Sequence, residues 1–364
     1  MSIEIARIAA FDTTVATKTG ATSGDGPSLF PSTGEYPAYD TLSYLIMASD
    51  TIRNESFGAA LAAAVPGQLV LDIGTGARLH WAQESLRLGA KHVTAIEVME
   101  SSYRRALKNV RVWHMEDAVT LLHGRSTDFD LGRSLDVCVA EVIGSLPGAE
   151  GAAAVLAHAR ATHLKTGGIV IPHRAVTMAA AVSLSSVLDH EPIAFPGAAV
   201  PYIEKLFQIN GRPFDMRLRV SRPELTAIVS DCGEVEVLDF NGVINTDQER
   251  EVTLAVRKDG VIDGILVWMR LWCHPDQSAI DALREQTHWG AVYFPLFSRE
   301  IKVSTGDRLE LNFRVALSDD SIHPDYHLSA TVRSRDGVHH GQCSALHHGG
   351  EFRAHPVYRK LFPS

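Results

Sequence analysis

The chain has 364 residues, of which 45% are hydrophobic and 21% charged, and its formal net charge is −9 at pH 7. This composition excludes a disordered protein, allows two domains with hydrophobic cores, and offers no overall positive charge for binding nucleic acid. No stretch approaches the roughly 18 consecutive apolar residues of a membrane span, and no secretion signal is visible at the N-terminus, so we expect a cytoplasmic protein without a membrane partner. The cysteines, Cys138, Cys232, Cys273 and Cys343, lack the paired spacing of a zinc site or a disulfide framework.

The N-terminal part divides into two predicted segments. Residues 1–35 are predicted to be a flexible arm, because Gly, Ser, Thr and Pro are frequent from residue 14 onward and the apolar residues show no period. From residue 36 to about residue 64 the apolar residues recur at helical spacing, and Pro66-Gly67 ends the pattern. A pair of helices is therefore expected ahead of the first strand.

Short apolar segments alternate with amphipathic ones between residues 68 and 172. The strand candidates are residues 69–73, 93–98, 110–113, 135–140 and 169–171. Such alternation predicts a parallel sheet with helical crossovers. Residues 36–172 are thus predicted to form one α/β Rossmann-like domain, including the helices at its start.

The pattern changes after Pro172, and strand-like segments dominate residues 173–364. The strongest are residues 175–182, 234–238, 251–256, 264–272, 308–316 and 327–332. Antiparallel strands at such short spacing predict a β-barrel or sandwich. Residues 189–222, which contain Pro and bulky apolar side chains, are interpreted as an insertion within this second domain.

A glycine turn follows the first strand candidate. Gly74 and Gly76 let the backbone approach a ligand closely, and the third glycine of a dinucleotide fingerprint is absent, which weakens a nicotinamide interpretation. Asp72 directly precedes the turn, and Glu97 ends the next strand, where a carboxylate binds ribose hydroxyls. This arrangement favours S-adenosylmethionine, with Asp72 organising its amino-acid end. The alternative is a tight turn that binds nothing.

Two glutamates nine positions apart, Glu141 and Glu150, follow the strand candidate at residues 135–140. Two fixed carboxylates in a mostly apolar site can hold a flat, permanently charged guanidinium on two edges. The pair therefore indicates arginine chemistry. A helix cap with a solvated acid is the alternative interpretation.

Three separated motifs resemble the protein arginine methyltransferase family, and the resemblance runs from about residue 36 to the end. Residues 47–53 are similar to the family's helical Met-Leu-x-Asp-x-x-Arg segment, and residues 141–150 to its double-glutamate loop. The most specific motif is Thr-His-Trp at residues 287–289, with the strand that follows it. Agreement at all three places by chance is improbable.

The resemblance implies the fold, the cofactor and the assembly of a class I methyltransferase. The expected fold is a Rossmann-like S-adenosylmethionine-binding domain followed by an antiparallel β-barrel with an inserted helical dimerisation arm. Residues 189–222 occupy the place of that arm, so the resemblance also implies a head-to-tail homodimer.

Roles carried over from the resemblance complete the expected site. Arg53 would meet the carboxylate of the cofactor and Glu97 its ribose, while Met115 and Glu116, after the strand candidate at residues 110–113, would frame the adenine. The expected cofactor-binding residues are Tyr39, Met47, Arg53, Asp72, Gly74, Gly76, Glu97, Met115 and Glu116. The expected catalytic residues are Glu141, Glu150, His288 and Asp50, with Tyr44 and Trp289 in the substrate pocket.

Departures from the family pattern accompany these matches. The family's Tyr-Phe-x-x-Tyr segment is represented only loosely by residues 36–39, and Tyr44 stands where a histidine is common. Near the double-glutamate loop, Ser145, Ala149, Gly151 and Ala152 replace residues that are usually larger. An altered wall of the active site is expected.

Two histidine pairs near the C-terminus, His339-His340 and His347-His348, raise a metal-site hypothesis. They lie in turn-like sequence without an acid or cysteine partner at ligand spacing, so no metal site is predicted.

The favoured function is methylation of a guanidino nitrogen of free L-arginine or a related small molecule. The reasons are the lack of an appended recognition module, an Ala- and His-rich composition, and the small residues near the glutamate loop; some bacterial relatives in specialised-metabolite biosynthesis use free arginine. A protein or peptide arginine is the alternative substrate, and a catalytically silent scaffold and an NAD-dependent oxidoreductase are the alternative functions. The number of methyl groups transferred is not predicted.

Overall fold

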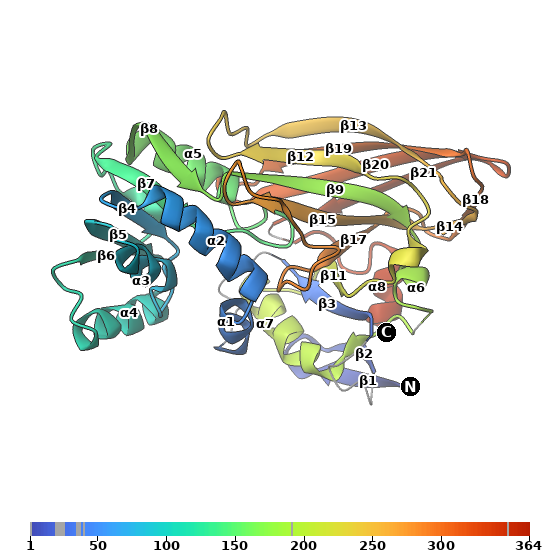
Figure 1. Ribbon diagram of the computed structural model, residues 1–364. Helices are drawn as coiled ribbons and strands as arrows, with labels where there is room; N and C mark the ends of the chain where they lie inside the picture. The colour runs from blue at the N-terminus through green and yellow to red at the C-terminus, as the bar shows by residue number, and fades with distance from the viewer. Residues whose placement is uncertain (1, 19–25, 34–37, 39–40, 191, 348) are drawn as a thin grey trace.

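The computed structural model describes residues 2–18, 26–33, 38, 41–190, 192–347 and 349–364. Figure 1 shows a domain with a parallel sheet and helices beside a larger domain of long antiparallel strands, with helix α7 and the N-terminal strands below the latter. Within the described residues, every helix is too short or too polar to cross a bilayer.

The prediction of a flexible N-terminal arm is wrong for the described part of residues 1–35. Strands β1 (Ile3–Ile8) and β2 (Thr13–Lys18) form an antiparallel hairpin, and β3 (Ser28–Ser32) joins the main sheet of the second domain. The β-branched Thr and Val residues of β2 suit a strand once a partner supplies backbone hydrogen bonds. The partner of β3 is the segment Arg217–Ser221, far along the chain, so local composition did not reveal this strand.

The predicted pair of helices is confirmed. Helix α1 spans Thr41–Ala48 and α2 spans Thr51–Ala64, with Asp50 between them as the N-cap of α2. The Asp50 carboxylate accepts a hydrogen bond from the backbone N–H of Arg53 at 2.9 Å, which satisfies one of the free donors at the helix start. The same carboxylate also accepts hydrogen bonds from His288.

The predicted parallel sheet is confirmed, with the strand order β6-β5-β4-β7-β8. Its strands are β4 (Leu69–Ile73), β5 (His92–Glu97), β6 (Val119–His123), β7 (Leu135–Ala140) and β8 (Leu164–Ile171). Helices α3 (His80–Arg87), α4 (Glu100–Val112) and α5 (Ala152–Thr162) complete the crossovers. The order reverses beside β4, so the loops after β4 and β7 flank a ligand crevice at the carboxyl edge of the sheet.

One predicted strand, residues 110–113, is instead the last turn of α4. Ala106 and Val110 are buried one helical turn apart, so the apolar run belongs to the inner face of a helix, and periodicity over four residues cannot separate the two cases. The true strand β6 begins at Val119. Met115 and Glu116 therefore precede it and lie at the edge opposite the ligand crevice, so their predicted contact with adenine is wrong.

The second domain consists of two antiparallel sheets around a shared apolar core, in agreement with the predicted barrel. One sheet has the order β12-β9-β15-β17-β11-β3, with β16 (Ile280–Asp281) attached to β15. Its strands besides β3 are β9 (Arg174–Val182), β11 (Arg217–Ser221), β12 (Gly233–Asp239), β15 (Gly264–Trp272) and β17 (Ala291–Pro295). The other sheet contains β13 (Gln248–Ala255), β19 (Arg308–Leu317), β20 (Pro324–Ser334) and β21 (Gly337–Ala345), and a small ladder joins β14 (Gly260–Ile262) to β18 (Ile301–Val303).

The insertion at residues 189–222 contains one helix and ends inside the sheet. After α6 (Leu184–Val187) and β10 (Phe195–Pro196) comes α7 (Val200–Asn210), and β11 then belongs to the main sheet and not to an arm. The apolar face of α7 is covered by the same chain, since Phe207 packs its ring against Phe11 of the N-terminal hairpin and Phe362, next to α8 (Pro356–Leu361). This covering accounts for the apolar sequence of the insertion.

Asp72 is buried inside the α/β domain. Its side chain has no exposed surface, and one carboxylate oxygen accepts a 2.6 Å hydrogen bond from the hydroxyl of Thr75. The predicted role at the amino-acid end of a cofactor is therefore corrected, because a group with no exposed surface cannot touch a ligand. Asp72 fixes the glycine turn, and burial raises its pKa to about 7.

We expect Asp72→Asn to change how thermal stability depends on pH. A carboxyl group with a pKa near 4 in the unfolded chain and about 7 in the fold favours folding most at low pH, and this contribution is lost as the pH rises from about 4 to 7. The melting temperature of the unsubstituted protein, relative to that of the variant, should fall by at least ~2 °C between pH 5 and pH 8. A difference that does not vary with pH would contradict a folded-state pKa near 7 for Asp72.

Candidate active site

The glycine turn and Glu97 lie next to each other at the carboxyl end of the parallel sheet and are joined by a hydrogen bond. Gly74 and Gly76 have φ values of +74° and +65°, and a Cβ added at Gly76 would meet no atom within 4 Å. The Glu97 carboxylate accepts hydrogen bonds from the backbone N–H groups of Gly76 at 2.9 Å and Met99 at 2.7 Å. Burial raises the pKa of Glu97. Each oxygen keeps a lone pair for a further donor, such as a ribose hydroxyl.

Arg53 projects from α2 into the space between the turn and the glutamate loop. It is only 5% exposed, and its guanidinium lies 4.9 Å from the centre of the Trp81 ring. One terminal nitrogen donates to the carbonyl of Met47 and to the side chain of Asn54, and the other forms a 2.8 Å ion pair with Glu141. Its buried Nε has no hydrogen-bond partner among the described residues. An acceptor such as a ligand carboxylate would satisfy it.

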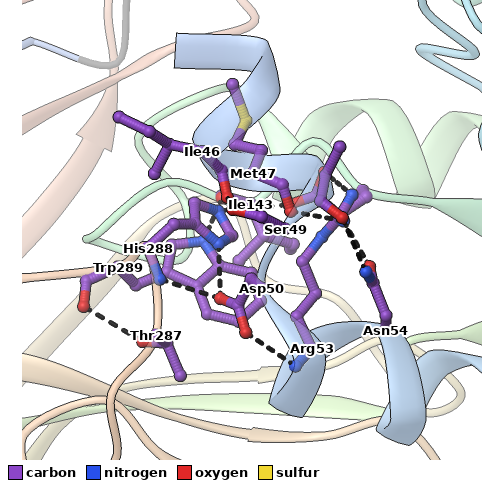
Figure 2. Close-up of polar contacts among 12 residues, drawn as sticks. Ile46, Met47, Ser49, Asp50, Arg53, Asn54, Ile143, Thr287, His288 and Trp289 are labelled. Carbon is purple, nitrogen blue, oxygen red and sulfur yellow. Dashed lines mark hydrogen bonds and ion pairs between the residues drawn. The ribbon is translucent and has the colours of Figure 1, made fainter. Parts of the chain in front are cut away.

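Asp50 and His288 are 238 residues apart in the sequence but are hydrogen-bonded to each other (Figure 2). The Asp50 carboxylate accepts hydrogen bonds from both the backbone N–H and the ring Nδ1 of His288, each at 2.8 Å. Burial acts to raise the pKa of Asp50, but the hydrogen bonds from His288 and Arg53 outweigh it and lower the pKa. The other ring nitrogen of His288 consequently faces Glu141, 3.7 Å from its carboxylate.

Glu141 and Glu150 line the same cavity. The loop between them folds back on itself, so that a Cβ on Gly144 would lie 3.5 Å from the Cγ of Glu150. Trp289 ties this loop to the second domain by donating its indole N–H to the carbonyl of Ile143 at 2.8 Å. The two acids are thus held by contacts from both domains.

The cavity is lined by six separate segments of the chain. Besides the two acids, its lining includes Phe30 of β3, Met47 of α1, Tyr202 of α7, Arg217 and Arg219 of β11, and His288 and Trp289 of the Thr-His-Trp loop. The small residues Ser145 and Ala149 also line it, while Ala152 is buried elsewhere and Gly151 packs against Ile322.

Some predicted site residues lie elsewhere. Tyr39 is outside the described residues. Tyr44 is not among the residues that line the cavity. Its hydroxyl forms a hydrogen bond with Ser102 of α4, and partial burial together with the charges of Glu97 and Glu150 raises the pKa of Tyr44 to about 12. Tyr44 therefore lies on the Glu97 side of the site and not in the substrate pocket.

Two groups of residues were missed by the sequence analysis. Gly124 follows β6 and donates its backbone N–H to the carbonyl of Glu97 at 3.1 Å, so the loop after β6 is the one at the ligand edge. The apolar residues 119–122 could have indicated the strand that precedes this loop. No sequence pattern indicated Arg217 and Arg219, because only the pairing of β11 with β17 and β3 brings them to the cavity.

The C-terminal histidines have partners that the sequence did not suggest. Asp320 accepts a 2.6 Å hydrogen bond from His323 and lies 3.5 Å from His347, while His339 and His340 lie in strand β21 and not in turns. His348 is outside the described residues. The rings of His323 and His347 stack at 4.0 Å with an angle of 7° between their planes, so their in-plane lone pairs do not converge on one ion. Hydrogen bonds from His323 outweigh burial and lower the pKa of Asp320, as in a His–Asp ion pair.

Comparison with known proteins gives a consistent result. No protein-family model matches the chain. Arginine N(omega)-methyltransferase of Streptomyces achromogenes subsp. streptozoticus is 28% identical over 290 residues, which are 77% of each chain. Protein arginine N-methyltransferase 9 of Mus musculus is 26% identical over 304 residues, or 74% of this chain. The match spans only 36% of the mouse protein and 34% of its human counterpart.

Solved structures show the same fold. Protein arginine methyltransferase 10 of Arabidopsis thaliana superimposes with a TM-score of 0.67 at 18% identity, covering 85% of this chain and 98% of that one. The Trypanosoma brucei PRMT1 enzyme–prozyme heterotetramer with AdoHcy gives 0.66 at 16% identity, with 85% and 99% coverage. The described fold is that of protein arginine methyltransferases, and the sequence is similar to arginine methyltransferases over about three quarters of the chain.

Proposed function

We propose that this chain is an S-adenosylmethionine-dependent N-methyltransferase that modifies a guanidino nitrogen of arginine. The observation that carries the proposal is the cavity in which Glu141, Glu150 and His288 meet. It lies beside the glycine turn, since a Cβ on Gly74 would lie 3.1 Å from Cγ1 of Val142, the neighbour of Glu141. A cation held by the glutamates would therefore be close to a ligand held by the turn.

The residues at the turn fit the cofactor. Glu97 has spare acceptor capacity for ribose hydroxyls, the space above Gly76 admits a ligand, and the buried Nε of Arg53 suits the carboxylate of an amino acid. We infer that the loop after β6, which starts at Gly124, lies near the adenine, in place of Met115 and Glu116. When bound, S-adenosylmethionine supplies a methyl group already activated by its sulfonium.

The main difficulty of the reaction is the weak nucleophilicity of a guanidinium. The group stays protonated at physiological pH, and its nitrogen lone pairs are delocalised. Glu141 and Glu150 would draw positive charge toward the nitrogen that they hold, which leaves the opposite nitrogen more nucleophilic. The proton released on methylation can pass to a glutamate or to the ring nitrogen of His288 that faces Glu141 at 3.7 Å.

Free L-arginine or a related small guanidino compound is the substrate that we favour. Phe30 and Tyr202, whose rings lie 5.4 Å apart, form part of the cavity wall, and we infer that they leave little room for a peptide backbone. The name of the Streptomyces relative, arginine N(omega)-methyltransferase, agrees with methylation of arginine itself. An arginine in a protein or peptide is the alternative, favoured by the name of the mouse relative.

A methyl-release assay tests this proposal. With S-adenosylmethionine present, we expect methylation of free L-arginine and little or none of an arginine-rich peptide, because the aromatic wall restricts the entrance. Mass spectrometry of the products would report the substrate and the number of methyl groups together. Turnover of the peptide alone would reject the small-molecule substrate.

We expect Glu150→Gln to remove most of the activity by about 10²- to 10³-fold in kcat, because the charge that polarises the guanidinium is lost while the shape is kept. Calorimetry should show nearly unchanged affinity for S-adenosylmethionine and no binding of NAD. Glu55→Gln, an exposed acid on α2, is the matched control and should keep full activity. An unaffected rate in Glu150→Gln would reject the clamp, and NAD binding would favour an oxidoreductase.

We also propose that the protein forms a homodimer. The apolar face of α7 is covered within the chain, but Ile3 and Ile5, 50% and 56% exposed, lie on the edge strand β1 that contacts α7. Association would remove this apolar edge from water. Sedimentation velocity should show a dimer that Ile5→Glu weakens. A monomer at all concentrations would contradict the proposal.

A further inference from the structure

The short turn that carries Glu150 contacts the second domain at both of its ends. We propose that Ile322, in the turn between β19 and β20, positions the Glu150 carboxylate through its contact with Gly151. The inference rests on the proposed methylation of a guanidino nitrogen, and it adds a residue of the second domain that acts through one of the two glutamates.

Glu150 is the third residue of a four-residue turn. The backbone N–H of Gly151 donates to the carbonyl of Gly148 at 2.9 Å and closes this turn. Glu150 lines the cavity, whereas the preceding residues Leu146 and Ala149 are buried in the apolar core of the second domain. The loop therefore places its apolar side chains in the other domain and its acid at the cavity.

Both glycines of the turn lie directly against side chains of the second domain. A Cβ added at Gly148 would lie 2.8 Å from a carboxylate oxygen of the buried Glu236. A Cβ added at Gly151 would lie 2.6 Å from Cγ2 of Ile322 and 3.2 Å from its carbonyl oxygen. Because neither place has room for a further atom, these contacts restrict the path of the chain before and after Glu150.

Ile322 is itself held in place by Asp320. One carboxylate oxygen of Asp320 accepts hydrogen bonds from the backbone N–H groups of Ile322 and His323, each at 2.8 Å, and from the hydroxyl of Ser318 at 2.9 Å. The other oxygen accepts the 2.6 Å hydrogen bond from the His323 ring. Such side-chain bonds to nearby backbone fix a turn, so the Ile322 side chain meets Gly151 at a defined position.

The position of Glu150 matters because the two carboxylates must act on one guanidinium. Glu141 is held from the first domain by its ion pair with Arg53, while the turn at Glu150 is held from the second domain. A displacement of about 1 Å can lower a rate by about 10²-fold. Ile322 does not line the cavity, so its side chain can be shortened without removing a group that would touch the substrate.

A double-mutant cycle tests the inference. Ile322→Ala removes the methyl group that contacts Gly151 and should lower kcat by about 10- to 100-fold, with unchanged affinity for S-adenosylhomocysteine. When Glu150→Gln is already present, Ile322→Ala should change kcat by less than about 2-fold, because the displaced group no longer carries the charge. Ile322→Val keeps Cγ2 and should stay within about 2-fold of the unsubstituted protein.

Hydrogen exchange examines the turn without any substrate. The N–H of Gly151 closes the turn, so in Ile322→Ala it should exchange at least about 10-fold faster than in the unsubstituted protein. The amides of β4, in the centre of the parallel sheet, should keep their exchange rates. A general loss of stability would instead accelerate both.

Ile228→Ala is the matched control. Ile228 is also a half-buried isoleucine of the second domain, but it packs against another part of the apolar core and does not line the cavity. Its loss should leave kcat and the exchange of Gly151 unchanged. Should Ile322→Ala fail to fold, Asp320→Asn removes the acceptor of the His323 ring and should change both quantities in the same direction by a smaller factor.

Three results would overturn the inference. These are an unchanged kcat in Ile322→Ala, a decrease by the same factor with and without Glu150→Gln, and an unchanged exchange rate of Gly151. Failure of the proposed function looks different: the exchange of Gly151 depends on Ile322, but neither L-arginine nor an arginine-rich peptide is methylated. In that case the exchange rates alone decide whether Ile322 fixes the turn.

Discussion

The carboxylate of Asp50 accepts three hydrogen bonds, and two of them join the two domains at the site. The donors are the backbone N–H of Arg53 in the first domain and two N–H groups of His288 in the second. One side chain therefore starts helix α2, which carries Arg53, and orients the ring of His288 toward Glu141. Because the partners are 238 residues apart in the chain, this geometry exists only when both domains are folded and docked. The rest of the site depends on that docking.

Three buried charges at or near the site are compensated by another charge or by backbone N–H groups. Glu141 is paired with Arg53, Glu97 accepts two backbone hydrogen bonds, and Arg217 lies near Glu236. An uncompensated buried charge would cost several kcal/mol, so these pairings let a polar cavity persist inside an apolar core. They also fix the acids in advance of a substrate, which is how preorganised electrostatics favour a reaction.

The N-terminal strands and helix α7 turn an open surface into an enclosed cavity. β3 extends the main sheet beside β11 and supplies Phe30, while α7 supplies Tyr202 as the second part of the aromatic wall. Both elements are held by apolar packing, with Phe207 of α7 at its centre between Phe11 and Phe362. The preference proposed for a small substrate thus originates in cavity residues that come from the N-terminal strands and from α7.

The sequence by itself determined the parallel sheet, the antiparallel second part and most of their strands. Glu141, Glu150, His288 and Asp50 were named as candidates because each belongs to a short motif that resembles a known family, and the structure brings them close together. The tertiary structure decided what depends on distant partners. The four-residue run ending at Trp113 belongs to the end of helix α4 because its inner face packs on the sheet, and this puts Gly124, and not Met115, at the carboxyl edge of the sheet. Likewise, β3 is a strand, and Arg219 a cavity residue, only because these segments pair with each other across about 190 residues of chain. Such pairing leaves no periodic signal in either segment, since the energy that selects it comes from burial and hydrogen bonds that form only in the assembled sheet.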